Sequence, residues 1–201
     1  MNNSIYYIPV FELPLFVLLV LSRAIILRRQ GIKALVFGAT DKSDFLLIPF
    51  IAFFFYALMA GIFNFPFPEF PVKSFWTASF FPSGLPVILL WTAIVLCTAS
   101  LIWFAFTLKV FGKSFRVGID ENTKEKLITK GPFALSRNPV YTAFIVFFTG
   151  IFLAYSGIIT AIFLFLLIIT IHRQVLREEK FLKSHYGKEY NDYCKKTRRY
   201  F

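Results

Sequence analysis

The chain has 201 residues, of which 57% are apolar and 20% aromatic, while only 16% are charged. Its 28 Phe residues cannot all be buried in a soluble protein of this size that keeps a polar surface. The composition excludes a disordered chain, a disulfide-rich secreted domain and a nucleic-acid-binding domain, and it predicts a membrane protein. The two cysteines, Cys97 and Cys194, predict neither a disulfide nor a metal site.

Three apolar stretches reach the length of about 20 residues that crosses a bilayer: residues 5–27, 45–63 and 85–111. A fourth, residues 139–171, contains Ser156-Gly157 near its middle, which indicates a turn. We therefore expect a tight hairpin of two helices there, the second continuing past the apolar run. The predicted fold class is all-α, a polytopic membrane bundle of five transmembrane helices with a cytoplasmic C-terminal helical tail.

The basic residues predict the orientation of these spans. If the chain crosses five times, 21 of its 22 Lys and Arg residues fall on one side. Because Lys and Arg collect in cytoplasmic loops, the N-terminus is expected outside and the C-terminus in the cytoplasm. Any single Lys needs no special function, because a basic solvated surface is attracted to anionic lipid headgroups. The expected localisation is the plasma membrane in a prokaryote or the endoplasmic reticulum in a eukaryote.

Two isolated polar residues in or beside the spans need separate interpretation. Glu12 is the one carboxylate inside an apolar run, so it is a candidate functional residue, but a side chain reaching the outer interface is the more frequent case. His172, at the border of the last span, is more often a hydrogen-bonded imidazole than a ligand, because no second His or Cys stands at metal spacing. No metal is predicted.

The polar residues of the basic side suggest a binding site. Asn138-Pro139 is typical of a helix start, and Arg137 precedes it, so an anionic group is expected to dock there. The hairpin returns Glu178 and Glu179 to the same face, where they suit an ammonium group or ribose hydroxyls. Either feature alone is ordinarily structural: helices often start this way, and a Glu pair is usually solvated. Their conjunction favours a pocket.

At these residues the sequence resembles the integral-membrane methyltransferases of the isoprenylcysteine carboxyl methyltransferase family, which are related to phospholipid methyltransferases. Residues 127–141, with Thr-Lys-Gly-Pro-Phe and Arg-Asn-Pro-Val-Tyr, are similar to that family's Thr-x-Gly-Pro-Tyr and Arg-His-Pro-x-Tyr segment. Residues 178–193 are similar to its Glu-Glu-x-x-Leu and Phe-Gly-x-x-Tyr-x-x-Tyr tail. The similarity covers residues 111–201, nearly half the chain.

The resemblance implies an S-adenosylmethionine site. By position, the cofactor contacts fall on Glu125, Lys126, Leu127, Ile128, Phe133, Asn138, Pro139, Val140, Tyr141, Glu178 and Glu179, and the expected catalytic residues are Arg137, Arg173 and Arg177. Arg137 is expected to bind the cofactor's carboxylate, and one of the other two arginines to orient the acceptor. Three positions depart from the family pattern: Asn138 stands for its His, Phe133 for its Tyr, and Gln174 for its acceptor-side Arg.

The resemblance predicts a membrane methyltransferase that acts on an amphiphilic acceptor entering from the bilayer, such as the carboxylate of an isoprenylcysteine-like lipid. Residues 1–111 would form a three-helix membrane region and residues 112–201 the catalytic region. Two alternatives stay open: an NADPH-dependent sterol-type reductase and a non-enzymatic lipid-binding protein that retains the fold. Nucleic acid is not expected as a partner, and the sequence does not predict an oligomeric state.

Overall fold

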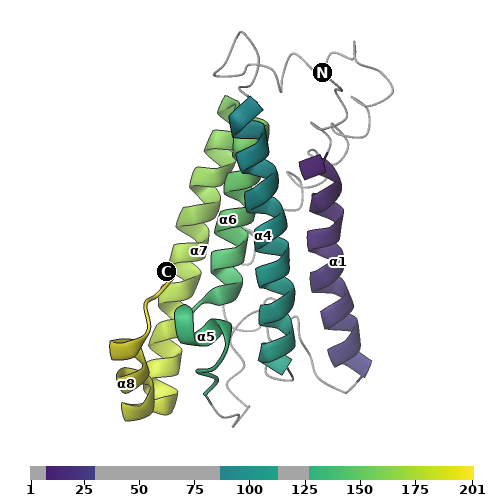
Figure 1. Cartoon of the computed structure of the whole chain (residues 1–201). Coiled ribbons are helices and arrows are strands. Elements are labelled where there is room, and N and C mark those ends of the chain that lie inside the picture. The colour runs from purple at the N-terminus through teal and green to yellow at the C-terminus, as the bar shows by residue number, and fades with distance from the viewer. Residues whose placement is uncertain (1–7, 30–86, 113–126) are drawn as a thin grey trace.

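A computed structural model describes residues 8–29, 87–112 and 127–201 of the chain (Figure 1). These residues form the helices α1 (Ile8–Arg29), α4 (Val87–Phe111), α5 (Pro132–Leu135), α6 (Pro139–Ala154), α7 (Ile158–Tyr186) and α8 (Lys188–Lys196). They contain no strand, so the all-helical class is confirmed for this part of the chain. The span predicted at residues 45–63 lies outside the described residues.

Two of these helices, α4 and α7, are long and apolar enough to cross a membrane, and α6 is a shorter apolar helix of 16 residues. α1 has 22 residues and corresponds to the first predicted span. Large apolar side chains are exposed on α1, α4 and α7, among them Phe11, Trp91 and Phe165. Exposed apolar surface of this extent is expected of helices that face lipid. The number of crossings stays a prediction.

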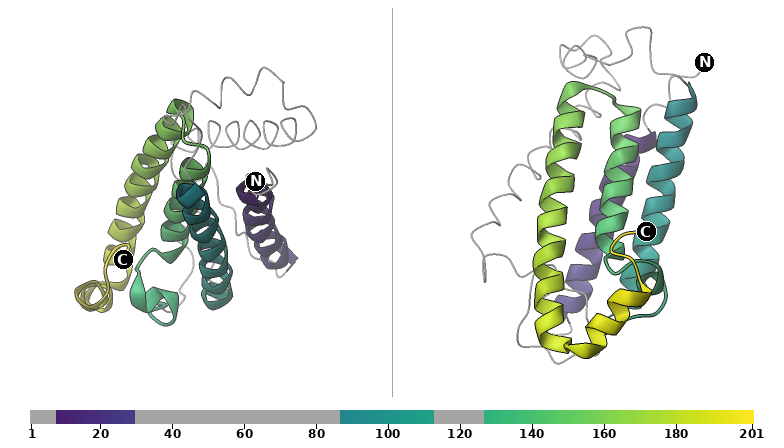
Figure 2. Two further views of the ribbon diagram at one scale, coloured as in Figure 1. Left: turned by 45° about the horizontal axis from the view of Figure 1, so that its top comes forward. Right: turned by 90° about the vertical axis from the view of Figure 1, so that its left-hand side faces the viewer.

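α6 is the central helix of the described bundle. It packs extensively against α4 and also against α7, and it lies between them in Figure 1 and in the right view of Figure 2. None of its residues is exposed. The contact with α4 depends on Gly150, because a Cβ there would lie 2.5 Å from Cys97 Sγ and 3.0 Å from the Ala93 carbonyl oxygen. A small residue thus brings the two backbones together, as is common between membrane helices.

An aromatic cluster joins α1 to this pair. The ring of Phe16 stacks on Phe104 of α4 at 4.8 Å between centroids and on Phe147 of α6 at 4.6 Å. Phe144 meets the same ring edge-on at 4.8 Å. Phe16, Phe104 and Phe147 are each no more than 4% exposed. Part of the Phe excess in the composition therefore fills the space between three helices instead of facing lipid.

The turn between α6 and α7 lies where Ser156-Gly157 predicts it. Thr160, in the first turn of α7, accepts a hydrogen bond from the Gly157 N–H at 3.1 Å and donates to the Tyr155 carbonyl at 2.7 Å. The Thr160 side chain therefore fixes both Tyr155 and Gly157, the residues on either side of Ser156 in the turn. α7 then continues to Tyr186, beyond its apolar part, as expected.

Polar residues occupy the bundle unevenly. Glu12 is only 7% exposed and accepts a hydrogen bond from Thr98 of α4 at 2.6 Å. Its side chain is therefore turned into the α1–α4 contact, whereas the sequence favours a side chain that reaches the outer interface.

One end of the bundle carries the basic residues. The last turn of α1 contains Arg28 and Arg29, and the last turn of α4 contains Lys109. Both turns lie at the end that also carries α5 and α8 (Figure 1). We call this the basic end.

Replacing Gly150 with Ala tests the α4–α6 contact. The added methyl group cannot fit against Cys97 Sγ unless a helix shifts, so we expect a loss of about 1–3 kcal/mol, the usual range for an overpacked core. Thermal unfolding in detergent measures the loss. The same substitution made in a Cys97→Ala background should cost less, because the nearest atom is gone. Equal costs in both backgrounds would contradict this explanation.

Candidate functional site

The start of α6 is built at the basic end by a short extended stretch after α5. Ser136 follows α5 with extended backbone, Asn138 takes the N-cap position, and Pro139 is the first helical residue, as the sequence predicts. The hydroxyl of Ser136 lies 3.1 Å from that of Thr142 and also accepts the Asn138 N–H at 3.1 Å. One buried serine thereby fixes the geometry of the helix entrance.

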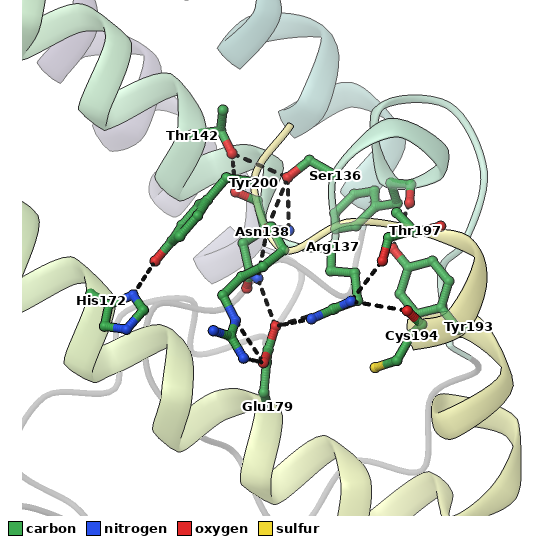
Figure 3. Close-up of polar contacts among 12 residues, drawn as sticks. Ser136, Arg137, Asn138, Thr142, His172, Glu179, Tyr193, Cys194, Thr197 and Tyr200 are labelled. Carbon is green, nitrogen blue, oxygen red and sulfur yellow. Dashed lines mark hydrogen bonds and ion pairs between the residues drawn. The ribbon is translucent and has the colours of Figure 1, made fainter.

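Glu179 of α7 is held by three donors from two other parts of the chain (Figure 3). Arg137 donates to its Oε1 from Nε at 3.2 Å and from Nη2 at 3.0 Å, and Arg199 donates to its Oε2 from Nε at 3.0 Å and from Nη2 at 2.8 Å. Asn138 is the third donor residue, with its Nδ2 at 3.3 Å from Oε1. The side chains of Arg137 and Glu179 are each 11% exposed, so this carboxylate is buried and fully compensated.

The remaining donors of Arg137 face backbone. Its Nη1 donates to the carbonyl oxygens of Cys194 at 3.2 Å and Thr197 at 2.6 Å. The guanidinium therefore connects the entrance of α6 to α7 and to the segment after α8. With these bonds formed, little of Arg137 is left to bind a ligand directly.

Glu178, the neighbour of Glu179, has a different environment. Its Oε1 accepts hydrogen bonds from the Tyr141 hydroxyl at 2.5 Å and from Gln174 Nε2 at 2.9 Å. Both contacts use one oxygen, which leaves Oε2 without a partner among the described residues. No described cation bonds this carboxylate. Glu178 is thus a carboxyl group anchored through one oxygen, and burial raises its pKa.

The first turn of α6 also offers donors. Asn138 occupies the N-cap position, but its side chain makes no capping hydrogen bond. Its Nδ2 instead donates to Glu179 and to the Arg199 carbonyl oxygen at 3.1 Å. The N–H groups of Val140 and Tyr141 have no acceptor within their own helix, because they lie in its first turn. They form a place where an anionic group can bind.

The segment around α8 is fixed by glycine geometry and by tyrosines. Gly187 separates α7 from α8 with φ +53°, a conformation that other residues rarely adopt. Tyr193 of α8 donates to the Phe133 carbonyl oxygen at 2.5 Å, and burial raises the pKa of its phenol, which keeps the hydroxyl a donor. Hydrogen bonding to Glu179 raises the pKa of Arg199, so that guanidinium stays charged.

The structure brings together five of the residues expected at the site: Arg137, Asn138, Tyr141, Glu178 and Glu179. Their roles toward a ligand stay predictions.

The other expected residues take varied positions. Phe133 is buried against Phe111 at 4.9 Å between ring centroids, and Pro139 is also buried. Val140, Leu127 and Ile128 are half-buried, and Arg173 and Arg177 are exposed on α7. Glu125 and Lys126 lie outside the described residues. Among the described residues, no group of three or more His, Cys, Asp or Glu side chains could hold a metal ion.

Sequence reasoning missed several residues that build this end. Arg199 is not among the residues that the sequence motifs single out, although it binds Glu179 directly. Trp103 of α4, which the sequence also does not single out, donates to the Pro139 carbonyl oxygen at 3.0 Å. Tyr200 is a further such residue: its hydroxyl lies 3.1 Å from His172 Nδ1, so the His172 imidazole is hydrogen-bonded, as expected. Only the doublet Arg198-Arg199 next to aromatic residues could have drawn attention to this segment.

Replacing Glu179 with Gln tests the ion cluster. The change removes the charge shared by Arg137 and Arg199 while keeping the shape, so we expect a loss of about 3 kcal/mol, typical of breaking a buried pair. Chemical or thermal unfolding of the full chain in detergent measures it. Glu189→Gln, on the exposed face of α8, is the matched control and should change stability little. Similar losses in both variants would argue against a special role for the cluster.

The segment that forms most of this end of the bundle matches a known protein family. Residues 81–189, more than half of the chain, match the family model for phospholipid methyltransferases. No curated protein and no solved structure shows significant similarity to the chain. The matched segment contains α4 to α7 and both polar segments that meet at the basic end, and it confirms the resemblance found in the sequence. The chain therefore belongs to the phospholipid methyltransferase family.

Proposed function

We propose that the chain is an integral-membrane methyltransferase that uses S-adenosylmethionine and methylates an amphiphilic acceptor at the basic end of the bundle. One observation carries the proposal. Glu178 is anchored through Oε1 by Tyr141, which lies in the first turn of α6, and the N–H groups of that turn are uncapped. The Glu178 carboxyl group and the N-terminus of α6 together suit a ligand that carries one positive and one negative group.

The residues present fit this cofactor. Its amino-acid part has an ammonium group and a carboxylate, and its ribose has two hydroxyls. Glu178 would accept from the ammonium group or from a ribose hydroxyl, and the first-turn N–H groups of Val140 and Tyr141 would bind the carboxylate. Arg137, expected from the sequence to bind that carboxylate, is engaged with Glu179 and two backbone carbonyls, so we assign it a positioning role.

When bound, the cofactor supplies a methyl group on a positively charged sulfur, and an acceptor atom with a free electron pair displaces that sulfur. The protein then has to align the two reactants and keep water away. Tyr141 and Gln174 fix the Glu178 side chain, and the ion cluster around Glu179 fixes the start of α6 against α7. A carboxylate acceptor would need no general base, whereas an amine acceptor must also lose a proton.

The acceptor is proposed to be lipid-like. Exposed apolar surface on α4 and α7 allows an amphiphile to approach from the bilayer, and the exposed Arg173 and Arg177 lie on α7 within two turns of Glu178. These two arginines are the residues we propose to orient a charged headgroup. Gln174 is neutral and bonds Glu178, so this position does not supply the acceptor-side cation that an Arg would supply. This favours a headgroup that does not need a buried guanidinium.

The family match supports methyl transfer over both alternatives, a sterol-type reductase and a non-enzymatic lipid-binding protein. It does not name a substrate for this chain. The proposed orientation places the basic end in the cytoplasm, where the cofactor is made, with α7 and α8 reaching into that compartment.

Glu178→Gln tests the cofactor site. The substitution keeps a hydrogen-bond acceptor but removes the charge, so S-adenosylmethionine should bind about tenfold more weakly or worse, the effect of losing a hydrogen bond to a charged group. Isothermal titration calorimetry on the full chain in nanodiscs measures the affinity. Glu189→Gln is the matched control. Unchanged affinity in the Glu178 variant would remove this residue from the site.

The cofactor class can be separated by stabilisation of the folded protein. S-adenosylmethionine should raise the Tm of the detergent-solubilised chain, because a ligand stabilises the state that it binds, and NADPH should not. Incubating membranes with a methyl-labelled donor and identifying the labelled lipid would then define the acceptor. A shift with NADPH alone would support the reductase instead.

A further inference from the structure

A segment beyond the family match reaches into the proposed site. Residues 197–201 follow α8, whereas the family match ends at residue 189. We call residues 197–201 the strap. The strap runs back along the start of α6, and the chain end marked C lies beside α6 and α7 in the views of Figures 1 and 2. Nothing in the family description accounts for its contacts.

The strap is bound to the entrance of α6 mainly through its backbone. The Arg137 N–H donates to the Arg198 carbonyl oxygen at 2.9 Å. The Arg199 carbonyl oxygen accepts from Ser136 Oγ at 3.2 Å and from Asn138 Nδ2 at 3.1 Å. These bonds place the strap directly against the N-cap residue of α6.

Side chains of the strap extend its hold to α7 and α4. Arg199 forms the second ion pair of Glu179, at 2.8 Å from Nη2. The Tyr200 hydroxyl lies 3.1 Å from His172 Nδ1, as Figure 3 shows, and the Phe201 ring centroid lies 6.4 Å from that of Trp103. The strap thus contacts α4, α5, α7 and the N-cap residue of α6 at the basic end.

The contact with Asn138 has a consequence for the anion site. An Asn at the N-cap normally accepts a hydrogen bond from an N–H of the first turn through its side chain. Here the Asn138 amide is instead held by Glu179 and by the Arg199 carbonyl, and no capping bond forms. Releasing the strap would free this amide to cap its own helix, and the N–H groups of Val140 and Tyr141 would then be covered.

We infer that the strap is part of the cofactor site and that Arg199 is a positioning residue. Arg199 holds Glu179 and the strap in place, so that the Asn138 side chain stays turned away from the first turn of α6. The N–H groups of that turn then stay uncapped and can bind the cofactor's carboxylate. The inference rests on the proposed function and adds to it a segment outside the family match. Arg198 and Phe201 are exposed, whereas Thr197 is buried, so the strap has one outward face and one face against the bundle.

Arg199→Gln and Arg198→Gln form a matched pair. Both remove one charge from the same segment, but only Arg199 bonds Glu179, and the Arg198 contact to Arg137 uses the backbone. We expect the Arg199 variant to bind S-adenosylmethionine about tenfold more weakly and the Arg198 variant to bind it as the parent does. Arg199→Lys should recover part of the affinity. In turnover assays the KM for the cofactor should rise while the KM for the acceptor stays unchanged.

A second substitution separates positioning from general loss of structure. In an Asn138→Ala background no side chain can cap α6, so Arg199→Gln should weaken cofactor binding much less than it does in the parent. If the strap were only a structural brace, the loss would be the same in both backgrounds. That result would overturn the inference while leaving the proposed function intact.

Limited proteolysis tests the strap without any variant. Trypsin can cut after Lys196, Arg198 and Arg199, and S-adenosylhomocysteine should slow these cuts in the parent chain if the strap closes the site. Cuts at an equal rate with and without this ligand, in a chain that calorimetry shows to bind it, would overturn the inference alone. A parent chain that binds neither form of the cofactor would overturn the proposed function and this inference together.

Discussion

The buried carboxylate of Glu179 is the contact on which the basic end depends. Two guanidiniums and an amide converge on it from residues before α6 and after α8, so a single side chain of α7 joins three separate parts of the chain. A charge in this position is costly unless it is compensated completely, and here both oxygens are bonded. The cluster fixes where α6 begins relative to α7, and every proposed ligand contact lies within a turn or two of that point.

The packing of α6 transmits this constraint into the bundle. Because α6 has no exposed residue and its Gly150 lies directly against α4, the helix has little freedom to slide or rotate. Trp103 of α4, which donates to the Pro139 carbonyl oxygen, also ties the start of α6 to α4. An N-terminus held in this way can present its backbone N–H groups in a fixed direction, which is the condition for using them to bind an anion.

The sequence predicts most of the local structure and part of the site. Apolar runs place α4, the α6–α7 hairpin and its Ser156-Gly157 turn, and Asn138-Pro139 marks the start of α6, because these signals depend on neighbouring residues. The pairing of Arg137 with Glu179 follows from the hairpin topology. The role of Arg199 could not be predicted, because the backbone path after α8 is set by tertiary hydrogen bonds that have no local pattern. Glu12 was misplaced for the same reason, since its partner Thr98 is 86 residues away.

The two adjacent glutamates show how one helix separates structure from binding. Successive residues of an α-helix point about 100° apart, so Glu178 and Glu179 cannot share an environment. Glu179 faces the arginines and is saturated, whereas Glu178 faces Tyr141 and, four residues back on its own helix, Gln174. Among the described residues only neutral donors bond Glu178, and burial raises the pKa of its carboxyl group, so no cation in this part of the chain fixes its charge. If both glutamates had the same surroundings, both would be structural or both would bind the ligand. In this arrangement Glu179 is the structural residue, and Glu178 is the residue proposed to bind the ligand.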